Sequence, residues 1–345
     1  MGMRIGLSGT GRIGRLLIRK AFSSPYKEVE IGVINALSDP ETVAHLLQYD
    51  TVHGRWDAQV EARVSELIIN GRRIPVVRQP SPELLPWREY GVDLAIDATG
   101  KFNNRQGASQ HLKAGASKVL LTAPGTDVDA TVVMGVNEGS YDPDKHQIIS
   151  AASCTTNCLV PVLHVMDQAF GVKQGWMTTI HSYTNDQNHM DNSHKDLRRA
   201  RACTSSIIPT STGVGKALKE VMPHLSTVIE GISMRVPTQN VSMIDLSLQL
   251  KRNVTEEEVK KAFQQATAGS IGSVLAYNEL PLVSTDYIGN DKSATIDGLS
   301  TMARGDQVKL FAWYDNEWAY ASRVYDLARH IHIGQKAHTR SMVGV

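Results

Sequence analysis

The sequence has few of the features that mark secreted, membrane-spanning or metal-binding proteins. Its 345 residues include only three cysteines, and so low and odd a number favours a reducing compartment over a disulfide framework. No apolar run approaches the length of a membrane span, and the first residues lack the apolar core of a signal peptide. We therefore expect a cytoplasmic protein without a membrane partner.

The chain also lacks a dominant charge and an internal repeat. Its formal net charge is +1, so no global field directs it to nucleic acid. Cys154 and Cys158 stand four residues apart, but Cys203 is distant, so a zinc site would lack ligands. We expect no metal and no nucleic acid as the main partner. The length favours two domains with ample core.

A glycine-rich segment near the N-terminus predicts a dinucleotide site. Gly9-Thr10-Gly11-Arg12-Ile13-Gly14 follows a short apolar strand and precedes the helical run 15–22. In this setting the first glycine permits the tight turn, the second admits the pyrophosphate, and the third lets helix and strand pack closely. Backbone N–H groups at the helix start, at Arg12 and Ile13, would then meet the pyrophosphate.

The strand at 28–34 ends where this motif usually carries an acid for the adenosine ribose. Here Ala36 has no carboxylate, and Asp39 before Pro40 is typical of a helix N-cap. The pocket would then accept NADP, because nothing repels a 2′-phosphate. The alternative is that another residue binds the ribose and that the cofactor is NAD.

Strands and helices alternate in the first half, which predicts a mostly parallel sheet. Apolar strands at 92–98 and 118–123 flank a helix at 105–116, and Asn70-Gly71 predicts a hairpin. Beyond residue 154, strands at 231–236, 241–250, 294–302 and 308–313 with few helices predict a mostly antiparallel sheet. The fold class is thus α/β: a Rossmann-type doubly wound parallel sheet plus an α+β catalytic domain.

We place the dinucleotide-binding domain at residues 1–153, completed by a C-terminal helix at 316–345, and the catalytic domain at 154–315. The boundary between them falls within Ser153-Cys154-Thr155-Thr156-Asn157-Cys158. This segment follows a strand at 147–150 and precedes a helical run at 159–166. A thiol at a helix start is favoured as the thiolate. The alternative is a buried, inert cysteine, but the flanking hydroxyls and Asn157 indicate a polar pocket wall.

A reactive cysteine needs a base or an imidazolium beside it. His181 ends a strand at 177–181 and is the best candidate, with His189 and His194 as alternatives. An imidazolium there would help hold Cys154 as the thiolate. The long polar stretch from 182 to 206 indicates either a solvated charge run or an anion site at a subunit contact.

Several residues of the second half suit anions. Thr212-Gly213 begins a helix at 214–221, where backbone N–H groups and a hydroxyl would accommodate phosphate. Arg235 ends a strand and joins Arg199 and Thr184 as a candidate oxyanion binder. An arginine at a strand end is otherwise usually just solvated.

With these residues collected, the chain resembles glyceraldehyde-3-phosphate dehydrogenase over nearly its whole length. Beside the glycine segment and the hexapeptide at Cys154, the shared pieces are His181-Ser182-Tyr183-Thr184-Asn185-Asp186-Gln187, residues 194–201, residues 234–237 and Trp313-Tyr314-Asp315-Asn316-Glu317-Trp318. The resemblance implies a homotetramer, with the loop at 182–206 at its subunit contacts.

The resemblance also implies roles. Cys154 attacks the aldehyde, His181 activates the thiol, and the thioester formed by hydride transfer is cut by inorganic phosphate. The predicted substrate and phosphate residues are Ser153, Thr155, Thr184, Arg199, Thr212, Gly213 and Arg235. The predicted cofactor residues are Gly9, Gly11, Arg12, Ile13, Gly14, Ala36, Arg78, Thr122, Ser193 and Asn316, with Asn316 holding the nicotinamide amide.

Two departures bear on the cofactor. NAD-specific members carry an acid where this chain has Ala36, and Leu-Pro where it has Asn192-Ser193. Photosynthetic NADP-accepting members have a serine matching Ser193, whose hydroxyl can donate to a 2′-phosphate. We therefore hypothesise NADP, alone or alongside NAD. A third departure, Ser8 where the family usually has Asn, changes one contact near the cofactor.

Two rival functions stay open at this stage. Erythrose-4-phosphate dehydrogenase shares the cysteine motif, although Thr184, Lys195 and Thr212-Gly213 follow the glyceraldehyde-3-phosphate pattern. A non-catalytic nucleotide-bound scaffold, or a nucleic-acid binder using the basic loop, would not depend on Cys154 and would bind in a strongly salt-dependent way. The sequence leaves the physiological direction, glycolytic or gluconeogenic, open.

Overall fold

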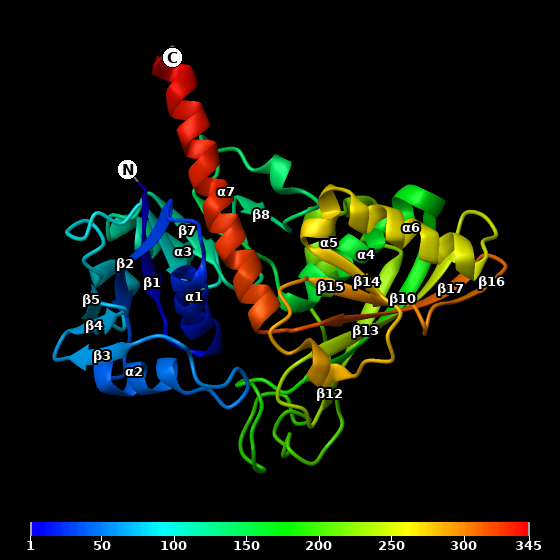
Figure 1. Cartoon of the computed structure of the whole chain (residues 1–345), viewed down its shortest axis with the longest axis horizontal. Coiled ribbons are helices and arrows are strands. Elements are labelled where there is room, and N and C mark those ends of the chain that lie inside the picture. Colours follow the sequence, from blue (N-terminus) through cyan, green and yellow to red (C-terminus); the bar gives the residue numbers. More distant parts are fainter. Residues whose placement is uncertain (1, 344–345) are drawn as a thin grey trace. The chain divides into compact units, whose positions relative to one another are not determined.

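The computed structural model describes residues 2–343, with side chains as far as residue 336, and it divides into two compact units (Figure 1). Unit 1 comprises Met1–Val132, Asn137–Ser153 and Ala321–Val345, and unit 2 comprises Val133–Val136 and Cys154–Tyr320. Each unit is built on its own sheet.

The sheet of unit 1 runs in the order β3-β4-β5-β2-β1-β6-β7-β9-β8 within the described residues. Its strands are β1 (Met3–Ser8), β2 (Val29–Asn35), β3 (Val60–Arg63), β4 (Glu66–Ile69), β5 (Arg72–Val77), β6 (Leu94–Asp97), β7 (Lys118–Leu121), β8 (Ala130–Thr131) and β9 (Ile148–Ser150). Its helices are α1 (Arg12–Ser23), α2 (Pro40–Gln48), α3 (Arg105–Lys113) and the greater part of α7 (Trp318–Val343).

The central strands of unit 1 are parallel and buried along their whole length. β1 pairs in parallel with β2 and β6, and β7 pairs in parallel with β6 and β9. Every residue of β6, β7 and β9 is buried, as expected of parallel strands covered on both faces. The carboxyl ends of these strands therefore share one edge, where a doubly wound sheet binds its ligand.

Two local predictions for this unit, the hairpin and the helix cap, are confirmed. Asn70 and Gly71 both have positive φ, 49° and 78°, and join the antiparallel strands β4 and β5. Asp39 caps α2 by accepting a hydrogen bond from the N–H of Thr42, with Pro40 as the first helical residue. The helix predicted at 105–116 ends earlier, at Lys113.

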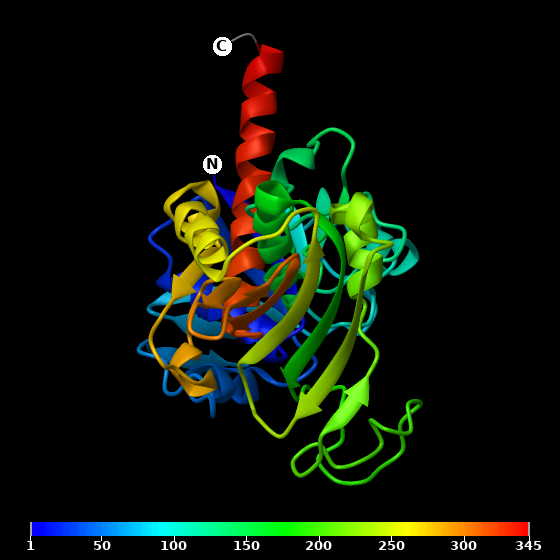
Figure 2. The same ribbon diagram turned by 90° about the vertical axis from the view of Figure 1, so that its right-hand side faces the viewer.

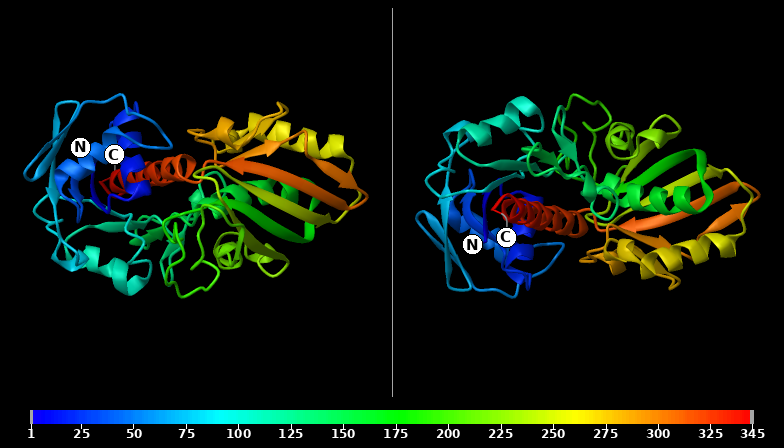
Figure 3. Two further views of the ribbon diagram at one scale, coloured as in Figure 1. Left: turned by 90° about the horizontal axis from the view of Figure 1, so that it is seen from below. Right: turned by 90° about the horizontal axis from the view of Figure 1, so that it is seen from above.

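The sheet of unit 2 runs in the order β11-β12-β10-β13-β17-β15-β14, with β16 paired to β17. Its strands are β10 (Val172–Ser182), β11 (Ile208–Thr210), β12 (Ile229–Val236), β13 (Ser242–Leu250), β14 (Leu275–Asn278), β15 (Ala294–Asp297), β16 (Met302–Arg304) and β17 (Gln307–Tyr314). The long strands β10, β13 and β17 lie side by side (Figure 3). β10 pairs with β12 and β14 with β15 in parallel, whereas the other strand pairs among the described residues of this sheet are antiparallel. This confirms the predicted mostly antiparallel sheet.

Helices α4 (Cys154–Phe170), α5 (Val214–Val221) and α6 (Glu256–Ala268) lie on one side of this sheet (Figure 1). Thr255 caps α6 in a capping box with Glu258. The single strand predicted at 294–302 is wrong, because β15 ends at Asp297 and β16 begins at Met302. Between them, Asp297 accepts hydrogen bonds from Ser300 N and Thr301 Oγ1, which closes a turn.

Two further segments complete the description. The stretch between β10 and β11 forms no helix or strand and extends as an irregular loop from its own unit (Figure 2). The last helix, predicted to begin at 316, begins at Trp318 and is continuous to Val343. Short 3₁₀ turns lie at Pro82–Leu84, Glu138–Ser140, Pro223–Leu225, Ser270–Ser273 and Ser284–Tyr287. None of the helices formed by residues 2–343 combines the length and the apolarity needed to cross a membrane.

Candidate functional site

Cys154 is the first residue of α4, and three residues separate it from the end of β9. This confirms the predicted strand-to-helix junction. Two residues earlier, Ala152 has a φ of 56°, a conformation that costs free energy for a residue with a Cβ and that concentrates at functional sites. The turn therefore brings the thiol to the start of a helix at the cost of local backbone strain.

The Sγ of Cys154 lies 3.5 Å from Nε2 of His181. The other ring nitrogen, Nδ1, lies 2.7 Å from the carbonyl oxygen of Ser182. The carbonyl oxygen can only accept, which favours a proton on Nδ1, whereas Nη1 of Arg235, which can only donate, lies 2.8 Å from the same nitrogen. We assign the ring proton to Nδ1, because Nη1 of Arg235 also has the Ser182 oxygen as its acceptor. Nε2 then presents its lone pair to the thiol, which makes His181 an acceptor for the thiol proton.

The expectation of an imidazolium beside a resting thiolate is wrong for this structure. Burial, together with the positive charge of Arg235, lowers the pKa of His181 to about 3. Burial also raises the pKa of Cys154 above its ordinary value, although Arg235 works in the opposite direction. At neutral pH the pair is thus a thiol beside a neutral imidazole, and the sulfur becomes nucleophilic only as its proton moves to Nε2.

Arg235 faces His181 because β12 and β10 run parallel with these two residues in register. Its Nη1 lies 3.0 Å from the Ser182 oxygen, to which it donates, and 2.8 Å from Nδ1 of His181. Its Nε is buried and has no hydrogen-bond partner among the described residues. A half-buried guanidinium with an unused donor fits an anion, as predicted for this residue.

Tyr314 is a site residue to which the sequence assigned no role. Its hydroxyl lies 3.0 Å from Oγ1 of Thr155 and 2.8 Å from Oγ1 of Thr179. Its ring stands edge-on to that of His181, with 6.0 Å between the ring centroids. In the sequence, the only sign of a role for Tyr314 was its place in residues 313–318, one of the segments that resemble the family. The pairing of strands in the fold shows that it lies beside the cysteine.

Asn316, predicted to hold the nicotinamide amide, is tied to the same centre. Ser242 Oγ accepts from the backbone N–H of Ser182 and donates to Oδ1 of Asn316, at 3.1 and 2.8 Å. The preceding residue, Val241, has a φ of 66°, and its carbonyl oxygen accepts from Ser182 Oγ. Ser182 and Ser242, both fully buried, therefore link His181 to the predicted cofactor residue Asn316.

Four of the predicted phosphate residues, Thr184, Arg199, Thr212 and Gly213, lie in the loop between β10 and β11 or just before α5. Arg199 is ion-paired with Asp186, and its Nε lies 3.5 Å from the Asp196 carboxylate. Gly213 stands at the N-cap position of α5 and makes no side-chain cap, which leaves that helix start suited to an anion. Ser193 is exposed, and its backbone N–H donates to the Asn192 side chain. All of these assignments stay predictions, as do those of Ser153 and Thr184.

In unit 1 the glycine turn has the shape that a dinucleotide requires. Gly9 has a φ of 101°, and a Cβ there would lie 2.8 Å from the carbonyl carbon of Ala98. A Cβ at Gly14 would fall on the carbonyl oxygen of Gly9, whereas one at Gly11 would meet nothing within 4 Å. Gly11 is the N-cap of α1, which has no side-chain cap. This open, positively polarised helix start fits a pyrophosphate.

The other predicted cofactor residues surround this turn. The Arg12 guanidinium is ion-paired with Asp50 and leaves the backbone at Arg12 and Ile13 as the predicted contact. Ala36 is buried directly after β2, and Arg78 donates to the carbonyl oxygen of Leu37 at 2.7 Å. Thr122 follows β7 and donates its N–H to Asp97 O. Ser8, the departure from the family pattern, accepts from the Asn35 side chain.

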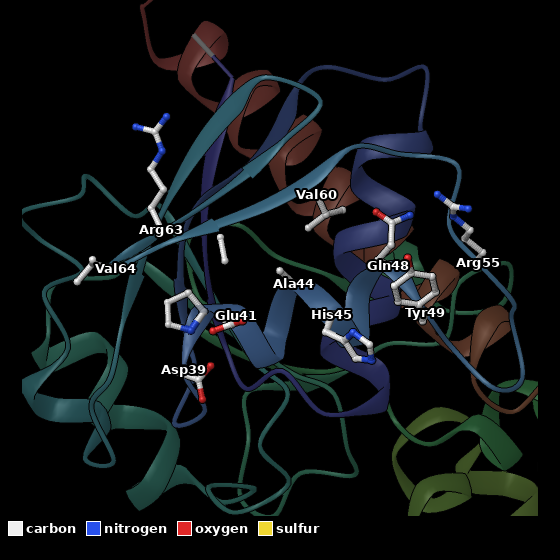
Figure 4. Close-up of a pocket in the computed structure, with 12 residues that line it drawn as sticks. Asp39, Glu41, Ala44, His45, Gln48, Tyr49, Arg55, Val60, Arg63 and Val64 are labelled. Atoms are coloured by element: carbon white, nitrogen blue, oxygen red, sulfur yellow. The ribbon is translucent and has the colours of Figure 1, made fainter.

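A hollow of about 860 Å³ lies beside α2 and β3 in unit 1 (Figure 4). Its lining mixes acidic and basic side chains, Asp39 and Glu41 with Arg55 and Arg63. None of the predicted cofactor residues lines it, so we assign it no part in the site. Within residues 2–343, no cluster of three His, Cys, Asp or Glu side chains is arranged to hold a metal.

A glycine turn shaped for a dinucleotide in one unit and a cysteine–histidine pair in the other define the class of NAD(P)-dependent dehydrogenases that work through a thiol. The family models that match are the NAD binding domain of glyceraldehyde 3-phosphate dehydrogenase, over residues 3–105, and its C-terminal domain, over residues 153–316.

Curated relatives agree with these models over nearly the whole chain. Glyceraldehyde-3-phosphate dehydrogenase 2 of Bacillus subtilis is 53% identical over 332 residues, which covers 96% of this chain and 97% of the relative. The enzyme of Geobacillus stearothermophilus is 51% identical, covering 96% and 98%. Glyceraldehyde-3-phosphate dehydrogenase 2 of Staphylococcus epidermidis is 49% identical, covering 99% of each chain. The chain belongs to the glyceraldehyde-3-phosphate dehydrogenase family.

The glycine turn predicts opposite outcomes for two alanine substitutions. Gly9→Ala should lower the free energy of unfolding by roughly 1–3 kcal/mol, because the residue has a positive φ and no room for a Cβ. Gly11→Ala should change stability by less than about 1 kcal/mol, yet its methyl group would stand where the pyrophosphate approaches. Chemical denaturation and calorimetric cofactor titration measure both effects. Normal cofactor affinity in Gly11→Ala would contradict the placement.

The cysteine–histidine pair predicts a particular pH dependence of alkylation. Because burial raises the pKa of Cys154, the thiol is protonated at neutral pH, and its thiolate fraction grows about tenfold per pH unit below that pKa. Iodoacetamide should therefore modify Cys154 in the cofactor-free protein at a rate that climbs from pH 6 to pH 9 without levelling off. Cys154→Ala supplies the background from other thiols. A plateau below pH 7 would show a resting thiolate and contradict the geometry.

Proposed function

We propose that this chain oxidises D-glyceraldehyde 3-phosphate, with inorganic phosphate and NAD(P), to 1,3-bisphosphoglycerate in a reversible reaction. The observation that carries the proposal is the pairing of Cys154 Sγ with the lone pair of His181 Nε2. The relatives named glyceraldehyde-3-phosphate dehydrogenase support the choice of substrate. The reaction would serve glycolysis or gluconeogenesis, since it runs in both directions.

In the first step the sulfur bonds to the aldehyde carbon as the thiol proton moves to Nε2. Nε2 returns that proton to the former carbonyl oxygen, which gives a thiohemiacetal on Cys154. It then takes the hydroxyl proton as a hydride leaves the carbon, which gives the thioester. The bound nicotinamide cofactor supplies the acceptor for that hydride, and Asn316, fixed by Ser242, would hold its amide group.

A bound phosphate group would also change the acidity of the histidine. Without a ligand, the positive charge of Arg235 opposes protonation of the ring. A substrate phosphate on Arg235 and Thr184 would offset that charge and make Nε2 a stronger base when the aldehyde is in place. Because Arg235 also lowers the pKa of Cys154, the bound phosphate would act through the base and not through the acidity of the thiol.

Inorganic phosphate completes the reaction by attacking the thioester carbon. The C–S bond breaks, the acyl phosphate leaves, and the thiol of Cys154 is restored. We assign the attacking phosphate to Ser153, Thr155, Arg199, Thr212 and Gly213. The uncapped start of α5 supports this assignment, and the ion pair of Arg199 with Asp186 holds that guanidinium in one place.

For the cofactor we propose NADP, alone or alongside NAD. Ala36 has no carboxylate for the ribose, and the Asp39 carboxylate caps α2 through Thr42 N and Oγ1. Arg78 is anchored on Leu37 O, so its positive charge lies next to the predicted place of a 2′-phosphate. Ser193 would add a hydroxyl from a neighbouring subunit.

The protein is proposed to act as a cytoplasmic homotetramer. Its cysteines are free thiols, which suits a reducing compartment. The face of the unit 2 sheet that carries Trp176 and Ile232 exposes 67% and 41% of these side chains. Large apolar side chains exposed together on a sheet support a contact with a second copy of the chain.

The activity is tested with purified protein, D-glyceraldehyde 3-phosphate and either cofactor, with and without inorganic phosphate. Reduced cofactor should form continuously only when phosphate is present, because the thioester otherwise accumulates after one turnover. Cys154→Ser should lower kcat by at least about a thousandfold, whereas Cys203→Ser serves as a matched thiol control. Faster turnover of erythrose 4-phosphate, or full activity of Cys154→Ser, would contradict the proposal.

The cofactor proposal is tested by steady-state kinetics with NAD and NADP. Ala36→Asp should shift the ratio of kcat/KM toward NAD by about tenfold or more, because the new carboxylate can bond the ribose and repels a 2′-phosphate. Ser38→Asp carries the same charge two residues along and is the control. A wild-type preference for NAD of about a hundredfold or more would overturn the proposal.

A further inference from the structure

A buried chain of polar side chains crosses unit 1 behind the glycine turn. The indole N–H of Trp87 donates to Nδ1 of His111 at 3.0 Å, and Nε2 of His111 lies 2.9 Å from Oδ2 of Asp97. Oδ1 of Asp97 accepts from the backbone N–H and the hydroxyl of Thr99, at 2.8 and 2.7 Å. Trp87, His111 and Asp97 are 0%, 0% and 1% exposed.

The indole fixes the state of this chain. An indole nitrogen can only donate, so Nδ1 of His111 must be an acceptor and Nε2 must carry the ring proton. That proton points at Asp97, whose carboxylate then receives three donors: the imidazole N–H, the Thr99 N–H and the Thr99 O–H. A proton on Nδ1 would face the indole N–H, so one neutral tautomer is selected.

The chain ends beside the predicted cofactor site. A Cβ on Gly9 would lie 2.8 Å from the carbonyl carbon of Ala98 and 2.9 Å from the nitrogen of Thr99, so residues 98–99 abut the glycine turn. The backbone oxygen of Asp97 also accepts from the N–H of Thr122 at 3.0 Å. Asp97 thus fixes the segments that follow two neighbouring strands, β6 and β7, at their carboxyl ends.

The burial of these residues argues for more than packing. The residues that hold the turn are buried, whereas Thr99 is half-buried and Gly100, with a φ of 70°, is exposed. A carboxylate is costly to bury, and an apolar side chain would serve a simple core better. A buried carboxylate at this place is explained if it has to hold the exposed turn in one position against the glycine backbone.

We propose that Asp97, oriented by His111 and Trp87, is a positioning residue for the dinucleotide. It holds the Thr99–Gly100 turn against Gly9 so that the turn forms one wall of the cofactor site. The proposal rests on the cofactor binding proposed above and adds three residues to which neither the sequence motifs nor the comparisons assign a role.

The test is calorimetric titration of each variant with NAD and NADP, together with the KM for cofactor and kcat. Asp97→Asn puts an amide donor against donors, so the Kd for both cofactors should rise by about tenfold or more. The rate of Cys154 alkylation should stay unchanged. Asp93→Asn is the matched control: Asp93 lies just before the same strand and accepts from Arg4 N, so its loss should leave the Kd within about threefold.

A second pair of variants separates positioning from folding. His111→Gln keeps an N–H for Asp97 and an acceptor for Trp87 and should keep the Kd within about threefold, whereas His111→Leu should raise it by about tenfold. If circular dichroism shows that Asp97→Asn does not fold, the Kd values of His111→Gln and His111→Leu for the cofactor decide instead. Equal affinity of His111→Gln and His111→Leu, or an equal loss in Asp93→Asn, would overturn the proposal. Absence of cofactor binding in the wild type would instead contradict the proposed function.

Discussion

The chemistry of this protein depends on one hydrogen bond, from Nδ1 of His181 to the carbonyl oxygen of Ser182. It leaves the lone pair of Nε2 facing the thiol of Cys154, and with the opposite tautomer the ring could not accept the thiol proton. The Ser182 peptide is itself fixed on both sides, because its N–H donates to Ser242 and its oxygen also accepts from Arg235. A single buried peptide group therefore positions His181, Arg235 and, through Ser242, Asn316.

Burial sets the resting state of this centre. Together with the charge of Arg235 it lowers the pKa of His181 and keeps the imidazole neutral, and it raises the pKa of Cys154 against the opposing charge of Arg235. The free protein thus holds a protected thiol instead of a standing thiolate, and a thiol is far less open to oxidation and alkylation. A substrate phosphate on Arg235 would make the imidazole a stronger base, because it offsets the charge that opposes protonation of the ring.

In each unit a neighbouring group sets the tautomer of a buried histidine, and the two histidines carry their proton on different ring nitrogens. In unit 2 a carbonyl oxygen selects the His181 tautomer with its proton on Nδ1, and in unit 1 an indole N–H selects the His111 tautomer with its proton on Nε2. Each selection depends on a group that can only accept or only donate. In both cases a buried backbone or core group sets the orientation of the side chain that serves the site.

The sequence predicted features that neighbouring residues determine, but it did not predict contacts between residues far apart in the chain. The Asp39 cap, the Asn70-Gly71 hairpin, the bounds of α5 and the junction at Cys154 follow from neighbouring residues and were predicted correctly. The contact of Thr155 with Tyr314 joins residues 159 positions apart, so no sequence spacing predicts it. The pKa shift of His181 escaped prediction for the same reason, since it needs the parallel register of β10 with β12.

The most direct test of the central claim is the ¹⁵N NMR spectrum of the His181 ring in cofactor-free protein, assigned with His181→Gln and followed from pH 5 to pH 8. The structure predicts one neutral tautomer throughout, with a protonated Nδ1 and a pyridine-like Nε2, because the pKa of His181 lies near 3. A ring that titrates within this range, or a protonated Nε2 at neutral pH, would show an imidazolium or the wrong tautomer and contradict the mechanism.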